Sequence, residues 1–220
     1  NAFISRVFTV MAMGLGITGL VSWLFATRYL GTIQDASQFF SGGMMWVVML
    51  APLVFVMVLS FGIHRLSYPV ATAIFIAYAS VMGISLSSIF FIYSMGTIFQ
   101  VFLMTSVTFG LMALLGATTN IDLTRFGSIL MFALIGLIVM SLVNWIFDSP
   151  LLHYIIGGAG VLIFAGLTAF DTQRLLRIGA QVQMGNESAN KMALMGALSL
   201  YLDFVNLFLF LLRLFGGSRD

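Results

Sequence analysis

The sequence contains no cysteine and few charged residues, and both absences narrow the kind of protein it can encode. Without cysteine there is neither a disulfide framework nor a thiolate metal site. Only 7% of the 220 residues are charged, whereas soluble domains carry about 25%, and no basic cluster could follow a phosphate backbone. We therefore expect neither a soluble fold nor a nucleic-acid partner.

Apolar residues, by contrast, make up 61% of the chain, and its mean hydropathy is +1.12. A helix needs about 20 apolar residues to cross a bilayer. Runs of this length predict seven transmembrane helices near residues 7–29, 45–63, 69–93, 97–117, 127–147, 151–173 and 192–214. Because these runs leave no room for a soluble domain, we interpret residues 1–220 as a single transmembrane domain of an all-α integral membrane protein.

Polar breaks separate the runs, and the longest break, residues 172–191, is predicted to be an extramembrane loop. Short cytoplasmic loops retain lysine and arginine, so the basic residues indicate the orientation. Three basic residues lie on the side opposite the amino terminus: Arg28, Arg213 and Arg219. Six lie on the amino-terminal side: Arg6, Arg65, Arg125, Arg174, Arg177 and Lys191. The count predicts a cytoplasmic amino terminus and an external carboxyl terminus, and the first residue, Asn1, predicts an omitted leader.

Glycines inside two spans favour close helix packing rather than cofactor binding. Gly14, Gly16 and Gly19 spell G-x-G-x-x-G, but a dinucleotide site requires a strand before the motif and a helix after it. Small residues within spans instead allow helix backbones to approach each other. We expect this of both glycine groups, the second being Gly157, Gly158 and Gly160, and we predict no cofactor.

Two aspartates carry the functional signal, because an ionisable group within hydrocarbon costs several kcal/mol and usually persists for function. Asp203 lies near the middle of the last span, whereas Asp171 lies toward the cytoplasmic end of the sixth. Helices joined by a loop are usually neighbours, so the carboxylates could face one another if a tilt, a kink or a late end of the sixth helix matches their depths. Alternatively, Asp171 could simply pair with Arg174 at i+3.

A pair of carboxylates within a membrane suits two kinds of chemistry. Carboxylate oxygens are hard ligands that bind Ca²⁺, and a site with few of them releases the ion readily, as conduction requires. Two close carboxylates also titrate as a pair, because their repulsion opposes ionising both. Residues of an ion pathway can therefore also sense pH.

Two other classes of membrane protein use similar residues but require motifs that this sequence lacks. Intramembrane aspartyl proteases carry a Tyr-Asp pair and a Gly-x-Gly-Asp motif, whereas Phe170 precedes Asp171 and Leu202 precedes Asp203. A retinal protein needs a lysine within its last helix, and Lys191 lies only at the entrance of that helix. We therefore predict that the protein is not an enzyme.

Two segments resemble the Bax inhibitor family, the transmembrane Bax inhibitor motif proteins, in a bacterial form. They are Gly166-Leu167-Thr168-Ala169-Phe170-Asp171-Thr172-Gln173 and Ala197-Leu198-Ser199-Leu200-Tyr201-Leu202-Asp203-Phe204-Val205-Asn206-Leu207-Phe208. The resemblance implies a seven-helix bundle with the last helix central. It also implies a pH-sensitive calcium leak in the bacterial inner membrane, with an aspartate pair as sensor and an arginine latch after the second helix.

The resemblance assigns these roles residue by residue. Asp171 and Asp203 match the sensor pair, which would also contact Ca²⁺ transiently, and Arg65 matches the latch by its position. Some relatives carry an acidic residue in the second span, but the segment 47–53 contains none, so that role is not transferred. We expect Ca²⁺, protons and the lipid bilayer as partners. A proton-coupled cation transporter, or a non-conducting scaffold that binds other membrane proteins, stays open as an alternative.

Overall fold

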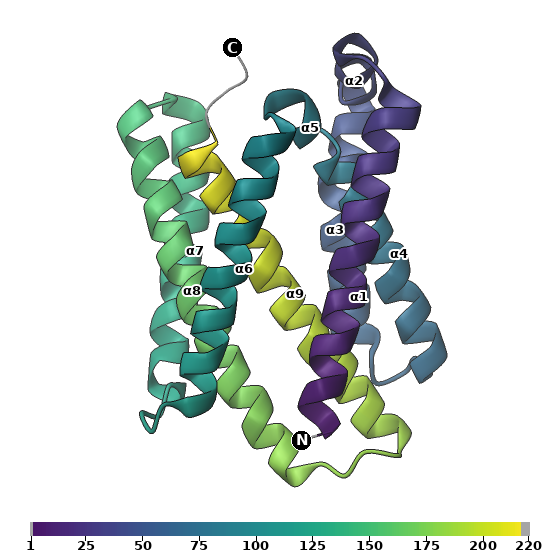
Figure 1. The fold of residues 1–220 in the computed structure, drawn as a ribbon, viewed down its shortest axis with the longest axis vertical. Helices are drawn as coiled ribbons and strands as arrows, with labels where there is room; N and C mark the ends of the chain where they lie inside the picture. Colours follow the sequence, from purple (N-terminus) through teal and green to yellow (C-terminus); the bar gives the residue numbers. More distant parts are fainter. Residues whose placement is uncertain (1, 217–220) are drawn as a thin grey trace. The chain divides into compact units, whose positions relative to one another are not determined.

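Helices make up almost all of the computed structural model, which describes residues 2–216 (Figure 1). Asn1, Arg219 and Asp220, which the topology prediction uses, lie outside the described residues. The elements in chain order are α1 (Ala2–Leu24), the π-helical η1 (Phe25–Leu30), α2 (Ile33–Phe39), α3 (Gly42–Gly62), α4 (Tyr68–Leu86), α5 (Ile89–Ile92), α6 (Met95–Thr118), α7 (Thr124–Phe147), α8 (Pro150–Gln181) and α9 (Glu187–Phe215).

Seven helical stretches within the described residues are long and apolar enough to cross a membrane. Five of them are the single helices α3, α6, α7, α8 and α9. The first joins α1 to η1, and the third joins α4 to α5 across the turn at Ser87 and Ser88. The prediction of an all-α protein with seven membrane-spanning helices is therefore confirmed, while the short helices α2 and α5 were not foreseen.

The turn between α7 and α8 forms where the sequence break Asp148-Ser149-Pro150 predicts it. Asp148 caps α7 in the left-handed conformation, with φ of 46°. The backbone N–H of Ser149 donates to the Asn144 side chain (3.0 Å), and Pro150 opens α8, where a missing N–H costs nothing. Local residue chemistry thus explains this helix boundary.

The predicted loop over residues 172–191 is wrong. Helix α8 continues to Gln181 and α9 begins at Glu187, so only residues 182–186 connect them. A polar composition is typical of loops, but here exposed polar residues alternate with buried ones at helical periodicity. Arg174 and Arg177 are exposed, whereas the intervening Leu175 is buried.

Unit 1, one of two compact units in the chain, contains residues 2–94 and 182–201 of the described range. Helix α4 packs against both α1 and α3. The Thr18 hydroxyl donates to the Ala79 carbonyl (2.9 Å) and shares a hydrogen bond with the Tyr201 hydroxyl (2.7 Å). Phe75 and Tyr78 pack edge-on against the Tyr201 ring, so the first part of α9 supplies a buried anchor to this unit.

Unit 2 contains residues 95–181 and 202–216 of the described range. Helix α8 packs against α6 and α7. Phe204 of α9 packs edge-on against Phe102 and Phe109 of α6, at centroid distances of 5.7 and 5.4 Å. In α9, 67% of the most apolar stretch is buried, against 6% in α7, which is compatible with a central last helix. The division does not test the single-domain prediction, which stays a prediction.

The predicted close approach at glycines holds for half of them. A Cβ at Gly14 would lie 2.7 Å from the Phe75 ring, and those at Gly157 and Gly160 would meet Leu214 and Phe210. The other three, Gly16, Gly19 and Gly158, have no described atom within 4 Å of an added Cβ, so the prediction of close packing is wrong for them. A glycine pattern alone does not tell which face of a helix meets a neighbour.

Candidate functional site

Asp203 is buried in unit 2, with 5% of its surface exposed. The next residue, Phe204, packs against Phe102 and Phe109 of α6, so Asp203 lies on a part of α9 that is held against apolar side chains. Among the described residues, the Oδ2 atom of Asp203 has no hydrogen-bond partner. A buried carboxyl oxygen without a partner is costly, and such groups mark functional sites in membrane proteins.

Asp171 is also buried in unit 2, with 8% exposure, in the middle of α8 rather than at its end. Helix α8 therefore ends later than the sequence predicts, which is one of the ways in which the depths of the two aspartates could match; that they match stays a prediction. Their carboxyl groups lie close enough to interact electrostatically. The charge of Asp171 thus reaches Asp203 within unit 2, whereas pairing of Asp171 with Arg174 stays a prediction.

Arg65, the predicted latch, is exposed in the turn after α3, where its backbone N–H donates to the Gly62 carbonyl (2.8 Å). It belongs to unit 1, whereas Asp171 belongs to unit 2, so its role stays a prediction. The turn that carries Arg65 ends at Tyr68, whose N–H donates to Glu187 of α9 (3.0 Å) and whose hydroxyl accepts from Arg6 (2.8 Å). Sequence analysis assigned no role to Glu187.

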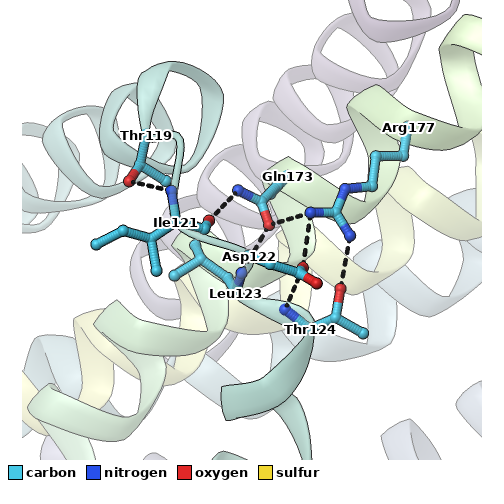
Figure 2. Close-up of polar contacts among 7 residues, drawn as sticks. All are labelled: Thr119, Ile121, Asp122, Leu123, Thr124, Gln173 and Arg177. Atoms are coloured by element: carbon cyan, nitrogen blue, oxygen red, sulfur yellow. Dashed lines mark hydrogen bonds and ion pairs between the residues drawn. The ribbon is translucent and has the colours of Figure 1, made fainter.

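A polar network in unit 2 holds the α6–α7 connection against α8 (Figure 2). The Gln173 amide donates to the Ile121 carbonyl and accepts from the Leu123 N–H, both at 2.9 Å. Arg177 donates to Asp122 and to Thr124, both at 2.7 Å, and to Gln173 at 3.0 Å. We call these contacts the loop clamp.

The loop clamp was missed by sequence analysis, although one signal of it was present. Gln173 and Arg177 are four residues apart, so they share one face of α8. Hydrogen bonds from Thr124 and Arg177 lower the pKa of Asp122 to about 2. Asp122 therefore stays ionised throughout the physiological pH range, and the ion pair with Arg177 persists there.

The seven apolar helices define this chain as a multi-pass helical membrane protein. Over residues 1–220 it matches the family described as "Inhibitor of apoptosis-promoting Bax1". It is 40% identical to the inner membrane protein YbhL of Escherichia coli K12, covering 100% of this chain and 93% of that protein. An uncharacterized protein of Borreliella burgdorferi is 41% identical, with 100% and 94% covered. The chain thus belongs to the Bax inhibitor family, as the two aspartate segments suggested.

Proposed function

We propose that this protein is a pH-sensitive calcium leak channel, or passive Ca²⁺ transporter, of the bacterial inner membrane. One observation carries the proposal: two carboxyl groups, each buried in an apolar helix, lie within electrostatic reach of each other. The name of the Escherichia coli relative, an inner membrane protein, supports the location. By this proposal the protein is not an enzyme.

Two carboxylates suit a transported ion better than a resident one. Ca²⁺ takes 6 to 8 oxygen ligands in stable sites. Among residues 2–216, no group of three or more histidine, cysteine, aspartate or glutamate side chains could hold a metal ion. Asp171 and Asp203 would therefore contact Ca²⁺ transiently, with the remaining ligands supplied by water or backbone carbonyls, and release it as conduction requires.

The same pair would make the pathway sensitive to pH. Protons compete with Ca²⁺ for the carboxylate oxygens, so flux should decline at low pH. At higher pH the family resemblance adds a gate: ionised Asp171 would hold Arg65 and close the pathway, and protonated Asp171 would share a hydrogen bond with Asp203 instead. Flux should therefore rise as pH falls from alkaline values and decline again in stronger acid.

Ca²⁺ flux into liposomes that contain only the purified protein tests the proposal. Asp203→Asn should lower the flux strongly because asparagine cannot carry the charge that attracts Ca²⁺. Asp148→Asn is the matched control: Asp148 is exposed, and asparagine tolerates its left-handed backbone. Wild-type flux in a folded Asp203→Asn protein would remove this residue from the pathway, whereas thermal stability should stay equal or rise, since a buried charge is lost.

Three further outcomes separate the alternatives. Flux that requires an opposing proton gradient would indicate a proton-coupled transporter, and the absence of flux would favour a non-conducting scaffold. Arg65→Ala should keep flux high at alkaline pH. If that variant retains the wild-type pH profile between about pH 5 and 8, where a carboxylate pair can titrate, the latch assignment is wrong.

A further inference from the structure

Gln173 ties the connection between α6 and α7 to the part of α8 that carries Asp171. Both ends of its amide are used, one as donor to Ile121 and the other as acceptor from Leu123 (Figure 2). The side chain is buried, with 8% of the residue exposed. Breaking a buried hydrogen bond leaves an unsatisfied polar group, so these contacts resist separation of the loop from the helix.

Arg177, one turn further along α8, adds a second layer of contacts. It donates hydrogen bonds to Asp122 and Thr124 in the loop and to the Gln173 amide on its own helix. The loop residues are further ordered by the Thr124 N–H, which donates to Asp122 (3.1 Å). The loop clamp thus holds α8 at two successive turns, which fixes its rotation as well as its axial position.

Helix geometry connects this clamp to Asp171. Gln173 follows Asp171 by two residues, which is about 200° around an α-helix and about 3 Å along its axis. The loop therefore holds the side of α8 that is opposite the carboxylate. On a side chain about 6 Å from the helix axis, a rotation of about 20° would move the carboxyl group by about 2 Å.

We propose that Gln173 is a positioning residue for Asp171: by fixing the rotation of α8 against residues 121–124, it sets the separation between the Asp171 and Asp203 carboxyl groups. The effect of this positioning on Ca²⁺ flux rests on the proposed function, whereas the positioning itself does not. The geometric part, the separation of the two carboxyl groups, is measurable without any flux.

The charged groups of unit 2 leave the loop clamp unchanged between about pH 5 and 8. Asp122 is the acid within it, and its pKa of about 2 lies well below this range. Helix α6 contributes no charged side chain. The remaining charged or titratable groups on the described elements of unit 2 and their caps are Arg125 and Asp148 on α7, His153, Tyr154, Asp171, Arg174 and Arg177 on α8, and Asp203 and Arg213 on α9. In this range the aspartate pair can titrate while the clamp holds its position.

Gln173→Met tests the proposal because methionine keeps the length of the side chain but makes none of the hydrogen bonds to Ile121, Leu123 and Arg177. Gln181→Met is the matched control, since Gln181 is exposed at the last residue of α8. Leu123→Pro removes the loop N–H without changing α8, and the Leu123 φ of −71° suits proline. This loop variant keeps the test decisive even if Gln173→Met folds poorly.

Two measurements are made on each variant in liposomes: infrared titration of the aspartate carboxyl bands, assigned with Asp171→Asn and Asp203→Asn, and the pH profile of Ca²⁺ flux. Freed from the loop clamp, α8 can rotate and separate the carboxyl groups, which weakens their repulsion. The titration midpoint should move to lower pH by about half a unit or more, about a threefold change in proton affinity, in both Gln173→Met and Leu123→Pro. The flux profile should move with it.

The two measurements also keep this proposal distinct from the proposed function. Absence of Ca²⁺ flux in the wild type, with shifted carboxyl bands in both variants, would reject the channel and support the positioning role. Unshifted bands in folded Gln173→Met or Leu123→Pro protein would overturn the positioning role, whatever the flux. A shift of equal size in Gln181→Met would overturn it as well.

Discussion

Gly116 of α6 lies so close to α8 that a single added methyl group should destabilise unit 2. A Cβ at this position would overlap the carbonyl oxygen of Ala169 and lie 2.9 Å from its Cα and carbonyl carbon. Backbone atoms cannot turn aside as a flexible side chain can, so in Gly116→Ala the two helices must move apart. The movement would occur at the turn just before Asp171.

The magnitude follows from two opposing effects. Overpacking a close contact costs about 1–3 kcal/mol, and we expect the upper part of this range because the obstacle is backbone. Replacing glycine by alanine within a helix, in contrast, stabilises the helix by up to about 1 kcal/mol. Gly116→Ala should therefore lower the free energy of unfolding by about 1–2 kcal/mol, which is the difference between these two effects.

Gly110 offers a matched control on the same helix, because an added Cβ there has no atom of the described residues within 4 Å. Gly110→Ala should only gain helix stability, which separates the two variants by about 2–3 kcal/mol. Thermal unfolding in detergent measures this difference; for soluble chains of similar length it would correspond to about 4 °C or more. If Gly116→Ala unfolds at the same temperature as Gly110→Ala, the close approach of α6 and α8 is wrong.

Three further predictions concern topology, acid stability and a buried hydrogen bond. Reporter fusions should place residues 182–186 in the cytoplasm and the carboxyl end outside, and a cytoplasmic carboxyl end would contradict the proposed orientation. The pKa of Asp122 is lowered to about 2 in the folded protein, so ionised Asp122 stabilises the fold above about pH 4, its ordinary pKa, and this stabilisation is lost as pH falls to about 2. Thermal unfolding curves of the wild type and of Asp122→Asn should therefore differ slightly at neutral pH and converge in acid. Tyr201→Phe should lower the free energy of unfolding by about 0.5–1.5 kcal/mol because it removes the hydrogen bond with Thr18. Tyr78→Phe should not lower it, since the Tyr78 hydroxyl has no partner among the described residues. Equal unfolding temperatures of the two variants would refute this prediction.

The membrane-spanning helices could be predicted from sequence because each apolar run is long enough to define its own span. The end of α8 could not, because its last turns alternate between exposed residues, such as Arg177, and buried ones, such as Leu175. That alternation has helical periodicity, but the polar composition concealed it. A periodicity count over residues 172–181 would have predicted the longer helix.

Some residues of the candidate site could likewise be predicted from the sequence, and others could not. Asp171 and Asp203 could be found because a carboxylate within an apolar run is conspicuous in a single segment. The loop clamp depends on contacts between Gln173 and residues about fifty positions earlier, so no local pattern contains it. Gly116 was not singled out at all, although it approaches α8 at the backbone, because composition does not tell which side of α6 meets a neighbour.

The capping of α4 by Glu187 has a consequence for how the protein is made. The Tyr68 N–H and the Thr18 hydroxyl find their partners, Glu187 and Tyr201, on α9, which follows α1 to α8 in the chain. The loop clamp and the packing of α6 and α7 on α8 join segments that are all synthesised earlier. Since segments fold as they emerge from the ribosome, unit 1 completes these hydrogen bonds only after α6, α7 and α8 of unit 2 have been translated.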